Sequence, residues 1–146
     1  EIIKKKILVE TEKAYKINTP DLSQKPYALF SPDNEMHELG LLFTNLELTL
    51  KGKHVIYLGQ SVPIKSLEFL LTKHKDITFI SNFTVSPENE NVEDYLNSFS
   101  STLLKNNKCK LLVSGRLLGT KPNISNSNIK TFESTKDLID HINNEK

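Results

Sequence analysis

The chain has 146 residues, a length that suits one domain with a single hydrophobic core. Its 19 basic and 18 acidic side chains nearly cancel, so the net charge gives no argument for a nucleic-acid or membrane surface. The single cysteine, Cys109, excludes an internal disulfide and predicts a packed thiol in a reducing compartment. No apolar run approaches the ~18 residues that cross a bilayer, and no signal peptide is recognisable, so we expect a cytoplasmic protein with no membrane partner.

The N-terminal part predicts a helix and a linker. Apolar residues recur at helical spacing among Lys and Glu in residues 1–16, which favours an amphipathic helix, although a short Ile-Leu-Val run leaves a strand open. Asn, Thr, Pro and Asp at 18–21 break this pattern, so 17–25 is predicted as a linker. The chain does not begin with methionine, and we interpret it as a piece of a longer protein. It divides into 1–25, helix and linker, and 26–146, one domain.

Strands and helices are predicted to alternate through this domain. Short apolar runs fit buried strands at Tyr27–Ser31, His54–Gly59, Ile77–Ile80, Lys110–Val113 and Ile129–Phe132. Apolar residues at helical spacing predict helices over 37–50, 63–71, 92–104 and 138–142. The last strand and the last helix have the weakest patterns. Ser81 to Glu90 is polar and turn-rich and predicts a loop.

This alternation predicts parallel strands joined by right-handed crossovers. Five such units make an α/β, flavodoxin-like (Rossmann-like) five-stranded parallel sheet of order 2-1-3-4-5. In that topology, ligands bind outside the carboxyl ends of the strands, at the switch point beside the first strand. The loop that follows Tyr27–Ser31 lies there, so we expect any binding site to include it.

That loop contains Glu35-Met36-His37-Glu38-Leu39-Gly40, which resembles the Asp-x-His-x-x-Gly loop of cobalamin-binding domains. The resemblance implies cobalamin as cofactor, with His37 displacing its nucleotide base as the lower axial ligand of cobalt. Glu35, in place of the family's Asp, would hold the other ring nitrogen and tune the ligand. Gly40 would keep the start of the helix bare where the corrin lies close. The alternative for His37 is an ordinary loop histidine that caps the helix or lies in solvent.

Two further elements resemble the same family. Ser81-Asn82-Phe83 stands where the family has Ser-x-Leu, whose serine hydrogen-bonds the dimethylbenzimidazole base of the cofactor. Gly115-Arg116 stands where the family has Gly-Gly, which lets the nucleotide tail pack against backbone. Three roles are open for Arg116: filling the slot of the tail, turning toward its phosphate, or forming a surface ion pair. Ser81 and Gly115 also fit as ordinary turn and strand-end residues.

The stretch from His37 to Leu67 is similar to the cobalamin-binding domain of MerR-type transcriptional regulators that respond to light or cobalamin. This similarity implies a sensory domain without a catalytic residue, not an enzyme. DNA would be bound through an upstream helix-turn-helix that is absent from this chain, and cofactor binding would change a homo-oligomer. Residues 1–16 would then be the last helix of an upstream helical bundle.

Two other functions are open at this point. One is a cofactor-free dimerisation or interaction module with a degenerate pocket, which Arg116 in place of a glycine favours. The other is a corrinoid-carrying domain of a methyltransferase or mutase, in which the chemistry belongs to the cobalt and to a separate catalytic domain.

Overall fold

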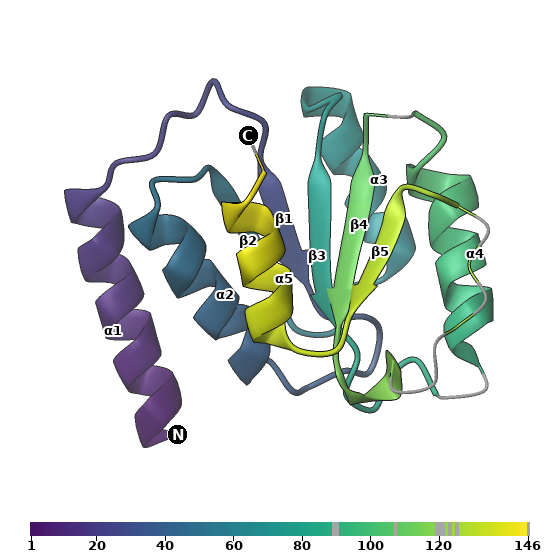
Figure 1. Ribbon diagram of the computed structural model, residues 1–146, viewed down its shortest axis with the longest axis horizontal. Coiled ribbons are helices and arrows are strands. Elements are labelled where there is room, and N and C mark those ends of the chain that lie inside the picture. The colour runs from purple at the N-terminus through teal and green to yellow at the C-terminus, as the bar shows by residue number, and fades with distance from the viewer. Residues whose placement is uncertain (89–90, 107, 119–121, 123, 125, 146) are drawn as a thin grey trace.

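The computed structural model describes residues 1–88, 91–106, 108–118, 122, 124 and 126–145. Five parallel strands form one sheet in the order β2-β1-β3-β4-β5, which confirms the predicted fold (Figure 1). The strands are β1 (Tyr27–Phe30), β2 (Val55–Gly59), β3 (Thr78–Asn82), β4 (Lys110–Ser114) and β5 (Ile129–Phe132). The helices are α1 (Ile2–Ile17), α2 (Leu39–Leu50), α3 (Ile64–Lys73), α4 (Val92–Leu103), the 3-10 helix η2 (Arg116–Leu118) and α5 (Thr135–Asn143).

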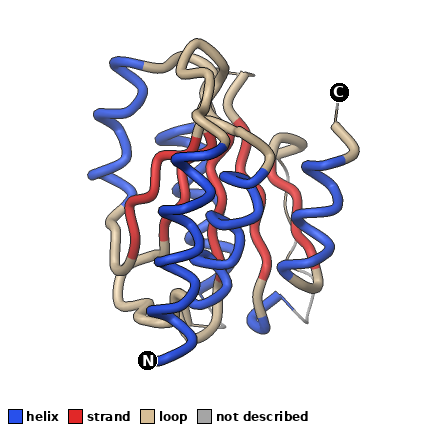
Figure 2. The backbone as a smooth tube through the Cα atoms, turned by 90° about the vertical axis from the view of Figure 1, so that its left-hand side faces the viewer, coloured by secondary structure: helices blue, strands red, loops and turns tan. Residues whose placement is uncertain are grey.

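Helices cover both faces of the sheet, and α1 packs alongside α2 (Figures 1 and 2). The face toward α3 and α4 holds a buried aromatic cluster in which Phe30 and Phe99 stack at 5.8 Å and Phe79 meets both rings edge-on. The face toward α2 and α5 holds an aliphatic cluster that includes Leu29 and Ile80. Neither face of the central strands is left to solvent, as expected for parallel strands joined by helices. None of the helices in the described part of the chain combines the length and the apolar character needed to span a bilayer.

β3 extends two residues further than predicted. Ser81 and Asn82, expected in a polar loop, pair in register with Val113 and Ser114 of β4. Backbone pairing with a neighbouring strand therefore overrides the polar character of these two side chains. Because side chains alternate along a strand, Ser81 shares a face with the aromatic cluster, whereas Asn82 faces α2 and α5. Residues 89 and 90, at the end of the predicted loop, lie outside the described residues.

The helix after the first strand begins at Leu39 rather than at His37. The backbone N–H of His37 donates to the Glu35 side chain, which holds this residue in the loop outside the helix. The helix ends as predicted before Gly52, which adopts a left-handed conformation with φ of 70°. At the N-terminus, α1 is a helix, so the alternative of a strand is excluded. Cys109 is fully buried, which confirms the predicted packed thiol.

Candidate functional site

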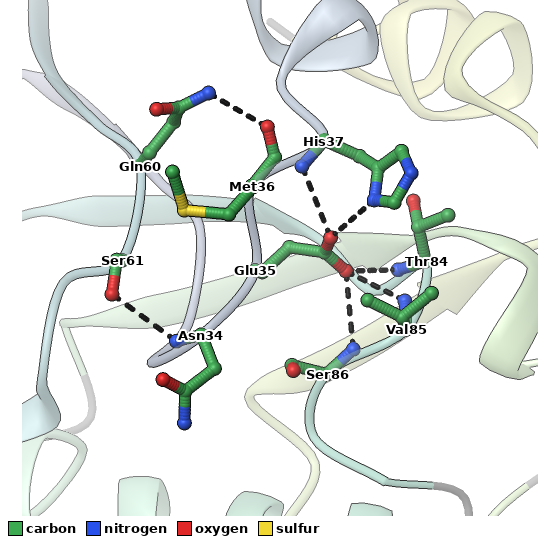
Figure 3. Close-up of polar contacts among 9 residues, drawn as sticks. All are labelled: Asn34, Glu35, Met36, His37, Gln60, Ser61, Thr84, Val85 and Ser86. Carbon is green, nitrogen blue, oxygen red and sulfur yellow. Dashed lines mark hydrogen bonds and ion pairs between the residues drawn. The ribbon is translucent and has the colours of Figure 1, made fainter.

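The loops after β1, β2 and β3 meet at the carboxyl edge of the sheet and are tied together by polar contacts (Figure 3). Asn34 and Ser61 both adopt left-handed backbone conformations, with φ of 67° and 52°. The Asn34 backbone N–H donates to Ser61 Oγ at 3.1 Å, and Gln60 Nε2 donates to the Met36 carbonyl at 2.6 Å. Non-glycine residues in this region of backbone space cluster at functional loops, where surrounding contacts hold them in place.

The carboxylate of Glu35 is the centre of this loop arrangement. Its side chain is fully buried, and Oε1 accepts hydrogen bonds from the backbone N–H groups of Thr84 and Val85 at 2.7 Å and of Ser86 at 3.2 Å. Oε2 accepts from the backbone N–H of His37 at 3.2 Å. One carboxylate therefore joins the loop after β1 to the loop after β3.

Glu35 is held in its ionised form. Burial by itself would raise the pKa of this carboxyl group, because a low-dielectric surrounding disfavours charge. The hydrogen bonds from the Val85 backbone, the His37 side chain and the backbones of Ser86 and Thr84 outweigh burial and lower the pKa below its ordinary value. The site thus presents a buried negative charge to His37.

His37 has its ring fixed by this charge while most of its side chain is exposed. Nδ1 lies 2.9 Å from Glu35 Oε2, and the His37 side chain is 61 % exposed. Because a carboxylate can only accept hydrogen bonds, Nδ1 carries the proton of the neutral ring. The lone pair is then on Nε2, on the side of the ring away from Glu35 (Figure 3). This is the arrangement of a histidine that binds a metal through one nitrogen while a carboxylate holds the other.

Gly115, which the resemblance places beside the slot of the nucleotide tail, lies close to Gly40, which it places beside the corrin. A side chain of this protein fills the slot between the two glycines. A methyl group built on Gly40 would collide with Asn82 Nδ2, and one built on Gly115 would lie 2.5 Å from Asn82 Oδ1. The Asn82 carboxamide is therefore in contact with both glycines. Thr135, at the start of α5, also approaches Gly40. Asn82 Oδ1 is buried without a hydrogen-bond partner.

Ser81 and Arg116 lie apart from this slot. Ser81 is fully buried, and its hydroxyl donates to the Phe30 carbonyl at 2.7 Å, across the neighbouring strand. Arg116 is exposed at the start of η2. Of the three roles open for Arg116, filling the slot does not agree with this structure, in which the Asn82 carboxamide lies against both glycines. The described structure leaves the guanidinium on the surface.

Sequence patterns missed two components of the site. The backbone amides of Thr84, Val85 and Ser86 could not be identified from residue type, because any residue except proline supplies an N–H. The signal for Asn82 is its place in the alternation of the strand. If β3 is extended to residue 82, the side chain of Asn82 lies on the sheet face toward α2, like that of Ile80. The polar composition of the stretch concealed that extension.

Glu38 connects the histidine loop to α1. Tyr57 on β2 donates its hydroxyl to Glu38 Oε2 at 2.8 Å, and Lys4 on α1 forms an ion pair with Oε1 of the same carboxylate. Burial, followed by the bond to Glu38, raises the pKa of the Tyr57 phenol, so it remains a donor. The first turn of α1 is thus held next to the residue that follows His37.

We expect Tyr57→Phe to lower the free energy of unfolding by about 1 kcal/mol, since it removes one hydrogen bond to a charged group that remains paired with Lys4. Urea denaturation followed by circular dichroism measures this change. Tyr15→Phe on the exposed side of α1 is the matched control and is expected to leave stability unchanged. Equal values for the two variants would show that the bond to Glu38 contributes nothing.

No known protein-family profile matches this chain. Among curated proteins, molybdenum cofactor guanylyltransferases from two strains of Helicobacter pylori are each 32 % identical to it, over 82 and 81 residues. These matches cover 56 % of this chain and 35 % of each relative. The chain therefore spans about a third of the length of the curated relatives it matches.

Solved structures with a similar fold include corrinoid proteins. A monomethylamine corrinoid protein of Methanosarcina barkeri aligns with a TM-score of 0.65 and 14 % identity, covering 93 % of this chain and 63 % of that one. A cobalamin-binding protein from Desulfitobacterium hafniense gives 0.58 and 13 %, covering 82 % and 58 %. The methanol:cobalamin methyltransferase complex of M. barkeri gives 0.58 and 16 %, covering 81 % and 45 %. The chain has the Rossmann-like fold of cobalamin-binding domains, with the histidine loop at the carboxyl edge of its sheet.

Proposed function

We propose that this chain is a corrinoid-binding sensory domain in which His37 is the protein ligand of cobalt. The observation that carries the proposal is the pair formed by Glu35 and His37. Glu35 is buried, ionised and held by three backbone amides, and it fixes an exposed imidazole with Nε2 available for coordination. A histidine that only caps a helix has no need of a buried carboxylate behind it.

The protein offers a single ligand rather than a cage. Among the described residues, no group of three or more His, Cys, Asp or Glu side chains is placed to hold a metal ion. One histidine suits a metal whose other positions are already filled by a macrocycle, and cobalt in a corrin ring is such a metal. When bound, the corrinoid would supply ligand exchange at cobalt. His37 would hold the metal, and Glu35 would orient the imidazole ring.

The residues fit one part of cobalamin and not another. His37 fits a cobalt ligand, and Glu35 fits the carboxylate that holds the other ring nitrogen. The slot expected for the nucleotide tail does not fit, because Asn82 lies against both Gly40 and Gly115. We therefore assign His37 and Glu35 to the macrocycle, and assign no role in binding a buried base to Ser81.

A regulatory role of the MerR type is supported by the stretch from His37 to Leu67 and by the contact between the site and α1. Glu38 follows His37 directly and is paired with Lys4, so a displacement of the histidine loop would be passed to the N-terminal helix. Binding then alters the packing of an upstream helical bundle, the oligomer of a cytoplasmic regulator and its affinity for DNA. This requires only that the ligand bind one assembly better than the other.

Visible absorption after loading and removal of free ligand tests the proposal, with hydroxocobalamin and aquocobinamide as the two probes. We expect retained corrin absorbance with the band shape of histidine ligation. His37→Ala is expected to weaken binding by about tenfold or more, because it removes the cobalt ligand that we assign among the described residues. His54→Ala, at the opposite edge of the sheet, is the control and should change nothing. Absence of retained corrinoid with both probes would overturn the proposal in favour of the cofactor-free module.

A corrinoid-carrying domain of a methyltransferase is the second candidate. The observation that favours it is the alignment of 93 % of this chain with a protein described as a monomethylamine corrinoid protein. Methyl transfer from methylated corrinoid on this chain to a partner enzyme would support the carrier. A change in operator binding by the full-length protein upon corrinoid addition, without methyl transfer, would support the regulator.

A further inference from the structure

We propose that this site binds the cobalt macrocycle without taking a nucleotide tail between the sheet and its helices, and that Asn82 closes the entrance to that space. The inference rests on the proposed corrinoid binding at His37 and specifies the class of ligand. The preferred ligand is a corrinoid of the cobinamide type, which has no nucleotide base, or one whose tail stays outside in solvent.

The first observation is the position of Asn82. Its carboxamide contacts Gly40 at the start of α2 and Gly115 at the end of β4, the two positions where a bare backbone would otherwise leave room. Thr135 on α5 also approaches Gly40, with its hydroxyl oxygen 3.2 Å from a methyl group built on that glycine. The carboxamide thus lies against the start of α2 and the end of β4, with α5 close to the same glycine of α2. We infer that a phosphodiester and a base cannot pass between these elements while Asn82 is in place.

The second observation is the packing beneath Asn82. The sheet face toward α2 and α5 is a close-packed aliphatic cluster whose members are at most 1 % exposed at its centre. Its central members are Leu29, Leu41, Ile80, Leu112 and Leu138. Insertion of an aromatic base would have to separate these side chains, since protein interiors leave few voids larger than a water molecule. The filled core and the closed entrance exclude the same part of the ligand.

The third observation concerns Ser81, which the family resemblance assigns to the base. A serine hydroxyl has one hydrogen to donate, and here it goes to the Phe30 carbonyl at 2.7 Å. Ser81 also lies on the face of β3 toward α3 and α4, opposite to Asn82. A base inserted beside α2 and α5 would therefore not meet this hydroxyl. Ser81 has a structural role that accounts for it without a ligand.

Asn82 Oδ1 is buried without a hydrogen-bond partner, so we expect that removing the Asn82 carboxamide does not lower the free energy of unfolding. A buried acceptor without a hydrogen-bond partner is destabilising, so removal of the carboxamide leaves no new unpaired group behind. Asn82→Ala is consequently expected to fold and to open the entrance. Asn82→Ser is a second variant with a short polar side chain. Asn97→Ala, on the exposed side of α4, is the matched asparagine control.

Titration of each protein with aquocobinamide and with hydroxocobalamin, followed by visible absorption, tests the inference. We expect the unmodified chain to bind aquocobinamide at least about tenfold more tightly than hydroxocobalamin. The base of hydroxocobalamin also competes with His37 for cobalt, so the comparison between variants with the same ligand is decisive. The aliphatic cluster beneath Asn82 also resists the base, so Asn82→Ala should recover only part of the difference between the two ligands. We expect it to tighten hydroxocobalamin binding about fivefold and to leave aquocobinamide binding unchanged, with Asn82→Ser intermediate and Asn97→Ala without effect.

The outcomes separate this inference from the proposed function. Binding of hydroxocobalamin as tight as that of aquocobinamide, with dependence on His37, would overturn tail exclusion and leave corrinoid binding intact. Preference for aquocobinamide that Asn82→Ala and Asn82→Ser do not alter would overturn the role of Asn82. Binding of neither ligand would overturn corrinoid binding itself, and tail exclusion with it.

Discussion

Replacing Glu35 by alanine is expected to lower the free energy of unfolding by about 3 kcal/mol, because a buried carboxylate with several hydrogen-bond donors is removed at once. The backbone N–H groups of Thr84, Val85 and Ser86 lose their common acceptor, and the loops after β1 and β3 lose the side chain that joins them. Urea denaturation at neutral pH, followed by circular dichroism, measures the change.

Glu35→Gln is the matched variant that separates shape from charge. Its side-chain carbonyl can still accept from the three backbone amides, but its amide nitrogen faces the N–H of His37 and cannot accept from it. We expect about half the loss seen with alanine, together with weaker corrinoid binding, because Nδ1 of His37 no longer meets a carboxylate. A loss below about 1 kcal/mol for Glu35→Ala would contradict the structural role assigned to this residue.

Neutral pH is the condition at which this comparison has its full effect. Folding lowers the pKa of Glu35, so its contribution to stability is fully present above the pKa of the unfolded chain. The contribution is lost as the pH falls through the lower pKa of the folded state. The difference between the original chain and Glu35→Gln is therefore expected to shrink in acid, and not between neutral and alkaline pH.

The sheet order could be predicted because it follows from local information. Each short apolar run and each helical spacing is visible within about ten residues, and the right-handed crossover then restricts the topology to few choices. Even the weak pair at the end of the chain, β5 and α5, is confirmed at the predicted place. The histidine loop was found for the same reason, since Glu35, His37 and Gly40 are close in sequence.

The state of the slot depends on contacts between distant segments, which the local patterns in the sequence do not reveal. Filling of the slot by Arg116 is one of the three roles that the sequence leaves open, yet Arg116 is exposed at the start of η2. Asn82 fills the slot because pairing with β4 extends β3 to that residue and turns its side chain toward α2. The polar side chains of Ser81 and Asn82 predicted a loop. Their backbones instead pair with β4 residues more than thirty positions away in sequence, and this pairing makes them part of β3.

Gly115→Ala is expected to lower the free energy of unfolding by about 3 kcal/mol, for two physical reasons. Gly115 has φ of 130°, a backbone conformation that side chains other than glycine rarely adopt. In addition, a methyl group there would collide with the Phe83 carbonyl oxygen and lie 2.7 Å from the Phe83 backbone nitrogen. The same urea measurement applies.

Gly52→Ala provides a control for the first of these reasons. Gly52 also has positive φ, 70°, but nothing lies within 4 Å of a methyl group built on it. We expect it to cost about 1 kcal/mol, the strain of a left-handed conformation alone. Equal losses for Gly115→Ala and Gly52→Ala would show that the close approach to Phe83 is not a constraint.

Combining Gly115→Ala with Asn82→Ala identifies which neighbour of Gly115 resists the added methyl group. The Asn82 carboxamide belongs to a side chain that a substitution can remove. The Phe83 carbonyl belongs to the backbone and cannot move away, because it accepts a hydrogen bond from the Leu117 N–H and lies in the turn after β3. We expect the double variant to recover less than half of the loss. Full recovery would mean that the carboxamide alone makes Gly115 necessary, so that the glycine is retained for the closed slot rather than for the turn.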